Sequence, residues 1–234
     1  MANTIISCEN LCLGYPKKTL TEPINLEIKS SQWLGIVGRN GIGKSTFFKT
    51  ILGILPQVSG TITVLENPPG ALNHKISYVP QDKTLNITHN VSGMTLIKAN
   101  YRPNHFGLPG FGRNLNQKIF YLLKTVGAES YAKRPFQTLS GGQKKRIFLA
   151  QALINNPKIL LLDEPLSDLD PQAKYDVIQA LKKIHYQENI TLLIISHDMH
   201  DIIHELNYFI HFKNRTAHFC DALPCLKKDN SVRI

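Results

Sequence analysis

The stretch GRNGIGKST, residues 38–46, decides the fold of this chain. Glycines at positions 38, 41 and 43 allow the backbone to wrap around an anion with its N–H groups pointing inward, at the positive end of the helix that follows. A short apolar run at 33–37 precedes the stretch, and helical spacing follows over 45–52. Strand, glycine loop and helix, with a Lys-Ser pair between them, predict a loop that binds the phosphates of a nucleoside triphosphate.

The side chains of this loop have different expected roles. Lys44 is expected to reach the β- and γ-phosphates, and the Ser45 hydroxyl is expected to bind a magnesium ion. The predicted nucleotide-binding residues of the loop are Gly38, Asn40, Gly41, Gly43, Lys44, Ser45 and Thr46.

Two carboxylates, Asp163 and Glu164, stand at the end of the apolar run 159–162. Burying charge at such a position costs free energy, and phosphoryl transfer needs a carboxylate for the metal and a group that orients water. We expect Asp163 to hold magnesium, directly or through water, and Glu164 to act as the general base. The alternative is a helix-capping Asp163 beside a solvated Glu164.

The nucleobase is expected to be adenine. Proteins that read guanine with this loop use an Asn/Thr-Lys-x-Asp element, and the sequence contains no such tetrapeptide. Adenine needs only a flat apolar or aromatic surface, and Tyr15, in a turn before the core, is expected to supply it by stacking. A purely structural Tyr15 is the alternative.

A second anion-binding helix start is predicted at residues 140–143. Ser140, Gly141, Gly142 and Gln143 open a helix that runs through Leu153. Taken alone this is an ordinary N-cap, because a serine there accepts a backbone hydrogen bond. The loop at 38–46 already accounts for one phosphate chain, so the second helix start makes sense if it serves the nucleotide of another copy.

The remaining patterns predict an α/β fold. Apolar runs at 158–162 and 191–195 are continuous and branched, as in strands that are buried on both faces of a parallel sheet. Helical spacing over 172–187 makes the unit strand, helix, strand. Alternation at 4–8 and 24–28 predicts an N-terminal antiparallel β layer.

A change of composition marks an inserted segment. Glycine, proline and asparagine cluster between residues 89 and 116, and a helical pattern follows over 117–126. We therefore expect a single domain over 1–234, with a core of 1–86 and 154–234 and a helical subdomain of about 87–153.

Composition restricts the partners. Lys and Arg total 27 against 17 Asp and Glu, a net charge of +10, but the basic residues occur as scattered doublets and triplets, so no nucleic-acid partner is expected. No window reaches the roughly 18 apolar residues of a membrane-spanning helix, and a signal-peptide pattern is absent. The four cysteines, at 8, 12, 220 and 225, fit no zinc pattern and are expected to be unpaired thiols of a reducing compartment.

Seven elements in order resemble the ATP-binding subunits of ABC transporters, across nearly the whole chain. They are Tyr15 at the A-loop position, GRNGIGKST as Walker A, Gln81 in Tyr-Val-Pro-Gln as the Q-loop, LSGGQ at 139–143 as the signature, ILLLDEP at 159–165 as Walker B, SDLD at 167–170 as the D-loop, and His197 in Ser-His-Asp as the switch histidine.

The resemblance implies a P-loop NTPase core and a head-to-tail dimer in which each ATP lies between one chain's phosphate loop and the other's residues 140–143. It implies that His197 contacts the γ-phosphate and positions water, and that Gln81 senses magnesium and the attacking water. The helical subdomain would receive the coupling helix of a membrane permease. Many members carry a small residue where Asp168 stands, so this chain places an additional carboxylate at the dimer seam.

The stretch 101–117 and the tail 208–220 resemble the ATPases of zinc, manganese and iron importers. This implies a peripheral subunit on the cytoplasmic face of the inner membrane of a bacterial-type cell, working with a permease and an extracytoplasmic solute-binding protein to import a divalent metal. The alternatives are the ATPase of another ABC importer or exporter, and an ABC ATPase that acts on DNA or ribosomes. The last class usually adds coiled-coil arms or a second ATPase domain, and this chain has neither.

Overall fold

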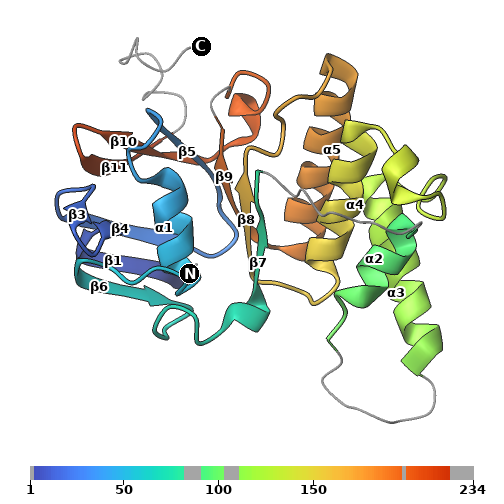
Figure 1. Cartoon of the computed structure of the whole chain (residues 1–234), viewed down its shortest axis with the longest axis horizontal. Helices are drawn as coiled ribbons and strands as arrows, with labels where there is room; N and C mark the ends of the chain where they lie inside the picture. The colour runs from blue at the N-terminus through green and yellow to red at the C-terminus, as the bar shows by residue number, and fades with distance from the viewer. Residues whose placement is uncertain (1–2, 82–90, 103–110, 197–198, 222–234) are drawn as a thin grey trace.

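The computed structural model describes residues 3–81, 91–102, 111–196 and 199–221 (Figure 1). The strands are β1 (Thr4–Cys12), β2 (Gly14–Tyr15), β3 (Lys18–Thr19), β4 (Ile24–Lys29), β5 (Trp33–Gly38), β6 (Ser59–Val64), β7 (Ile76–Val79), β8 (Ile159–Asp163), β9 (Thr191–Ile195), β10 (Tyr208–Lys213) and β11 (Thr216–Asp221). The helices are α1 (Lys44–Ile51), α2 (Gly93–Ala99), α3 (Phe111–Val126), α4 (Gly141–Leu153) and α5 (Pro171–Glu188), with short 3₁₀ turns η1 (Asn73–Lys75), η2 (Phe136–Thr138) and η3 (Ile203–Glu205).

A six-stranded sheet forms the centre of the molecule, in the order β11-β10-β5-β9-β8-β7. The strands from β10 to β7 run parallel, and β11 is antiparallel to β10. Asp163 of β8 lies opposite Ile195 of β9, which in turn lies opposite Ile36 of β5. The loops that follow β5, β8 and β9 therefore leave the sheet at the same edge.

Successive residues of the central strands pack into two different hydrophobic cores. Leu160, Leu162 and Ile194 join the core that contains helices α2 to α5, whereas Leu161 and Leu193 join the core that contains α1 and the antiparallel layer. Both faces are buried, which explains why the strand sequences are continuous rather than alternating. Figure 1 shows α1 on one side of the sheet and α3, α4 and α5 on the other.

The predicted N-terminal antiparallel layer is confirmed as a three-stranded sheet in the order β4-β1-β6. Strand β4 buries every second residue, because one of its faces joins the core that contains α1 and the other meets solvent. The strands β6 and β7 and the helix α2 were not predicted. The α/β fold class is confirmed, and the limits of the helical subdomain at 87 and 153 stay a prediction, since residue 87 lies outside the described residues.

Cysteine pairing corrects one expectation. Cys8 and Cys12 are buried free thiols, but Cys220 at the end of β11 is disulfide-bonded, so the expectation of unpaired thiols is wrong there. Position 225 lies outside the described residues. In the described part of the chain, none of the helices has the length and apolar character needed to cross a membrane.

Candidate nucleotide-binding site

The glycine loop connects the end of β5 to the start of α1 and presents its backbone to open space. Gly41 and Gly43 have φ angles of 75° and 120°, a region that residues with a side chain rarely adopt. A Cβ at Gly41 would meet nothing within 4 Å. Gly43 caps α1 without any side-chain hydrogen bond, so the first N–H groups of the helix remain available to an anion.

Lys44 is buried at the first position of α1, with 6% of its surface exposed. Its Nζ donates hydrogen bonds to the carbonyl oxygens of Gly38 at 2.6 Å and Arg39 at 3.1 Å. Burial lowers the pKa of the Lys44 ammonium, and the charges of Glu164 and Asp163 oppose that shift. The loop carbonyls hold the ammonium beside two carboxylates. An incoming phosphate can replace these carbonyls as the hydrogen-bond acceptor of Lys44.

Asp163 ends β8 and is buried. The Tyr78 hydroxyl donates a hydrogen bond to its Oδ2 at 3.3 Å. Burial, and then the charge and the hydrogen bond of Asp163, raise the pKa of Tyr78 to about 12, so this phenol keeps its proton and remains a donor at neutral pH. Carboxylate and hydroxyl oxygens are the donors that magnesium prefers, and Asp163 with the half-buried Ser45 fits that preference.

Glu164 follows directly and is 5% exposed. Its backbone N–H donates to the carbonyl oxygen of Ile195 at 2.9 Å, which ties it to the end of β9. Its φ angle of 51° lies in the left-handed region. The structure thus brings the two carboxylates and Lys44 to one edge of the sheet, and a general base at Glu164 stays a prediction.

Tyr15 lies in the small β2–β3 hairpin, paired with Lys18, and its side chain is 45% exposed. The hairpin adjoins the glycine loop, because a Cβ at Gly43 would lie 3.5 Å from Thr21 and 4.0 Å from Leu13. An exposed aromatic ring beside the phosphate loop is what adenine stacking needs.

Residues 140–143 form a complete capping box at the start of α4. The Ser140 Oγ accepts from the Gln143 N–H at 3.4 Å, and the Gln143 Oε1 accepts from the Ser140 N–H at 3.1 Å. Ser140 and Gly141 are exposed. Gly142 is buried because it packs against α5, so closely that an added Cβ would lie 2.8 Å from Ala173.

The helices α4 and α1 pack on opposite faces of the six-stranded sheet. Figure 1 shows the same separation. Within one chain, residues 140–143 therefore belong to a different layer from the phosphate loop, and their service to another copy stays a prediction.

Gln81, two residues after β7, is exposed and lines a cavity of about 230 Å³ with Gly141, Ser167 and Asp168. The cavity joins the end of β7, the start of α4 and the segment after β8. Asp168 is exposed and has a φ angle of 59°. His197, the predicted switch histidine, lies outside the described residues.

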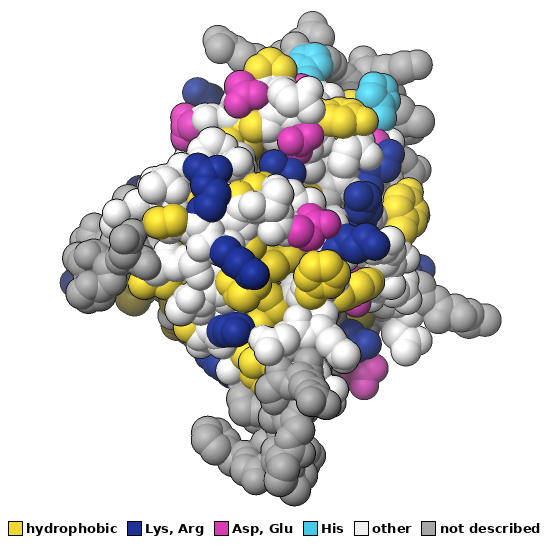
Figure 2. Space-filling model, turned by 90° about the vertical axis from the view of Figure 1, so that its right-hand side faces the viewer, with side chains coloured by type: hydrophobic (Ala, Val, Ile, Leu, Met, Phe, Trp, Pro, Cys, Tyr) yellow, Lys and Arg dark blue, Asp and Glu magenta, His cyan; other side chains and the backbone are white. Residues whose placement is uncertain are grey.

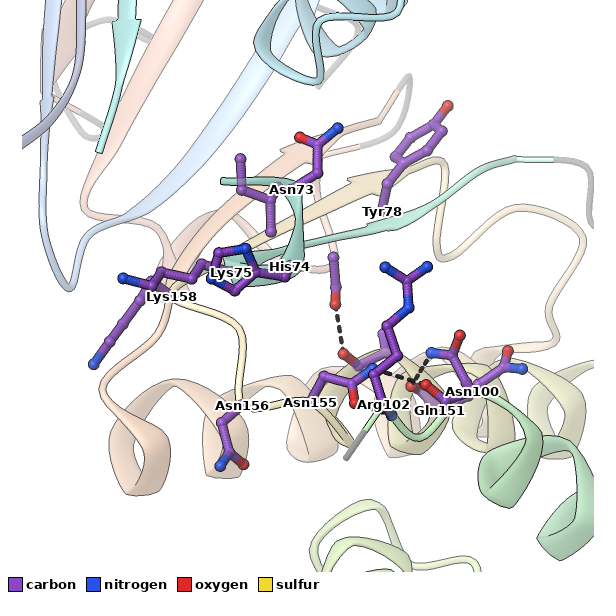
Figure 3. A pocket seen from close by; sticks show the side chains of 13 residues that line it. Asn73, His74, Lys75, Tyr78, Asn100, Arg102, Gln151, Asn155, Asn156 and Lys158 are labelled. Carbon is purple, nitrogen blue, oxygen red and sulfur yellow. Dashed lines mark hydrogen bonds between the residues drawn. The ribbon is translucent and has the colours of Figure 1, made fainter. Parts of the chain in front are cut away.

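A larger cavity, of about 510 Å³, lies between η1–β7 on one side and, on the other, the segment that follows α2 and the end of α4 (Figure 3). Asn100 and Asn155 hold its wall together, since Asn100 Nδ2 donates to the Gln151 carbonyl oxygen and Asn155 Nδ2 donates to that of Asn100. In Figure 3 the Arg102 guanidinium points into the cavity toward Tyr78. Among the residues that line it none is acidic, and the basic ones are His74, Lys75, Arg102 and Lys158.

Two residues at the site were not singled out from the sequence. Tyr78 stands in the Tyr-Val-Pro-Gln stretch, three residues before Gln81, and Lys145 stands in the basic triplet 144–146. The Lys145 Nζ donates to the Glu164 carbonyl oxygen at 3.1 Å. Both contacts join elements that are far apart in the chain. The only sequence signal for the two residues was their position beside recognised motifs.

A parallel sheet whose edge carries a glycine loop, a buried lysine and two carboxylates defines a P-loop nucleoside triphosphatase. A family model described as "ABC transporter" matches residues 21–167. The chain belongs to the ABC transporter family, whose ATP-binding proteins are ATPases that drive transport.

Individual relatives cover most of the chain. The manganese transport system ATP-binding protein MntB of Listeria innocua is 30% identical over 84% of this chain and 82% of its own length. The zinc import ATP-binding protein ZnuC of Buchnera aphidicola is 32% identical over 94% and 84%. The structure of cbiO1 from Clostridium perfringens, part of the ABC transporter complex cbiONQ, superposes with a TM-score of 0.85 at 27% identity, over 97% of this chain and 92% of cbiO1.

We expect Tyr78→Phe to raise the magnesium concentration needed for half-maximal ATPase activity roughly five-fold, because a hydrogen bond to Asp163, the predicted magnesium ligand, contributes about 1 kcal/mol. The effect should be the same at every pH well below the Tyr78 pKa of about 12. Magnesium titrations of steady-state turnover measure it. Tyr208→Phe, which alters a phenol packed on Phe219 in β11, is the control, and an unshifted magnesium dependence in Tyr78→Phe contradicts the assignment.

Proposed function

We propose that this chain is the ATPase subunit of an importer for a divalent metal ion, manganese or zinc in the first instance. The observation that carries the proposal is the similarity to manganese and zinc transport ATP-binding proteins over more than four fifths of both lengths. It is supported by the site, where Lys44, Asp163 and Glu164 lie at one edge of the sheet.

Each group at the site has a defined task in the proposed reaction. Lys44 and the N–H groups of the loop bind the phosphates, Ser45 and Asp163 hold magnesium, and Glu164 takes a proton from the attacking water. Magnesium, when bound, neutralises charge on the phosphate oxygens. Gln81 and His197 complete the proposal by orienting that water.

The proposed working unit is a head-to-tail dimer of this chain. Ser140 and Gly141 are exposed at the start of α4, whose first turn holds no acidic residue, and such a helix start suits the γ-phosphate of a nucleotide. They lie in the layer opposite α1, so they complete the phosphate loop of the second copy. Asp168 and Gln81, which line the adjoining cavity, would lie at the same seam.

Glu164→Gln is expected to trap the dimer with ATP and magnesium, because the base is lost while every phosphate contact remains. Size-exclusion chromatography with light scattering should show a dimer of this variant. Adding Ser140→Arg to that variant should restore the monomer and leave ATP bound to the loop. A Glu164→Gln protein that remains monomeric at saturating ATP, or a double variant that still pairs, contradicts the shared site.

We further propose that the permease docks at the 510 Å³ cavity through an acidic segment. The cavity bridges the two parts of the fold, its basic side chains include Arg102, and Tyr78 reaches from its wall to Asp163. The Tyr78 side chain therefore connects this cavity, where a carboxylate would dock near Arg102, to Asp163, the proposed magnesium ligand. An extracytoplasmic solute-binding protein and a position at the cytoplasmic face of the membrane belong to the same proposal.

Reversing the charge at Arg102 should weaken the complex with the permease. We expect Arg102→Glu to reduce co-purification with the co-expressed permease in detergent, and to leave the basal ATPase activity of the isolated chain unchanged. Arg134→Glu, an exposed arginine in the loop after α3, is the matched control. Equal recovery of permease with Arg102→Glu and Arg134→Glu contradicts docking at this cavity.

The transported solute is tested in proteoliposomes that contain this chain, its permease and the binding protein. Uptake of radioactive manganese or zinc should require ATP and should be lost with Glu164→Gln. Uptake of a different solute, or ATP-driven efflux, would assign the chain to another ABC transporter.

Stimulation of ATPase activity by DNA or ribosomes would favour the non-transport class. Figure 2 gives no support to that class, because basic side chains are scattered over the helical face among neutral and hydrophobic ones.

A further inference from the structure

The backbone of Glu164 is held in a conformation that it would not adopt unaided. Its φ angle is 51°, in the left-handed region that residues with a Cβ seldom occupy. Pro165 follows directly, and a proline favours extended backbone at the residue before it. A residue in such a conformation persists only when its surroundings fix it. The groups that fix Glu164 therefore set the direction of its carboxylate.

Three hydrogen bonds converge on the Glu164 carbonyl oxygen. The Ser167 Oγ donates at 3.0 Å, the Ser167 N–H at 3.3 Å and the Lys145 Nζ at 3.1 Å. Lys145 Nζ also lies 3.4 Å from the Ser167 Oγ. The two donors on Ser167 belong to the turn that follows Glu164. Lys145 comes from α4, in another layer of the molecule.

We propose that Lys145 is a positioning residue for hydrolysis, which holds the backbone of Glu164 so that its carboxylate faces the attacking water. The proposal rests on the proposed role of Glu164 as the base. Lys145 lies less than two turns beyond the capping box of Ser140 on the same helix. A displacement of the start of α4, when a nucleotide of the second copy binds there, therefore moves an ammonium that contacts Glu164 of its own chain.

The chemistry of the contact dictates the variants. Lys145→Met keeps the length and apolar stem of the side chain but has no donor. Lys145→Gln keeps an N–H donor on a shorter stem. Ser167→Ala removes one of the other two donors to the same oxygen. Lys144→Met is the matched control, because Lys144 lies 5.8 Å from the Phe136 ring and makes no contact with Glu164 in the described structure.

The full chain is assayed for steady-state ATPase activity, for ATP affinity and for thermal unfolding. Lys145→Met should lower kcat roughly ten-fold, since misplacing a catalytic group is costly while phosphate binding is untouched. Its Kd for ATP and its Tm should match those of the parent and of Lys144→Met. Lys145→Gln should recover most of the lost kcat. Lys145→Met and Ser167→Ala should combine non-additively, because both act on one oxygen.

Failure of this inference and failure of the proposed function give different results. If Glu164→Gln abolishes turnover while Lys145→Met is fully active, the positioning role is overturned and the base remains. If Glu164→Gln retains turnover, the proposed base is wrong and the inference falls with it. A Lys145→Met protein that loses ATP affinity or Tm in proportion to kcat overturns the inference in favour of a structural lysine. Should that variant not fold, the comparison of Lys145→Gln with Ser167→Ala carries the same test.

Discussion

The buried ammonium of Lys44 is the constraint on which the rest of this structure depends. A lysine withdrawn from water is costly unless polar groups surround it, and here two loop carbonyls accept its hydrogen bonds while two carboxylates stabilise its charge. Those partners come from the ends of β5 and β8. The ammonium of Lys44 is therefore compensated only while the parallel register of the sheet keeps these two strand ends together. The antiparallel layer and the helices bury the two faces of the sheet and thereby keep that register.

The helix α4 connects this charged edge to the second layer at two points. Near its C-terminal end, the Ser77 Oγ of β7 donates to the Ala152 carbonyl oxygen at 2.6 Å. Near its start, Lys145 donates to the carbonyl oxygen of Glu164, the residue directly after β8. The 510 Å³ cavity and the start of α4 are thus each joined by one side chain to the pair Asp163 and Glu164, Tyr78 from the cavity and Lys145 from the helix.

The sequence predicted those parts of the fold whose pattern is local. The glycine loop, the continuous runs of β8 and β9 and the helix α5 each carry their signal within one element. The contact of Tyr78 with Asp163 was beyond such reasoning, because it depends on the register that sets Tyr78 opposite Leu161, two residues before the carboxylate. Strand β6 was missed because only two of its six residues are buried. Residues 140–143 suggested a shared site because the loop at 38–46 already accounted for one phosphate chain, and that sharing stays a prediction.

The capping box of Ser140 and Gln143 has a consequence for how copies of this subunit meet. In the isolated chain each half of the proposed composite site makes internal hydrogen bonds, from the Ser140 N–H to Gln143 and from Lys44 to its loop carbonyls. Association then exchanges internal hydrogen bonds for external ones, which contributes little free energy without an additional charge. In the proposed dimer the triphosphate would supply that charge, so the two surfaces would associate weakly without nucleotide, and the nucleotide concentration as well as the subunit concentration would set the dimer population.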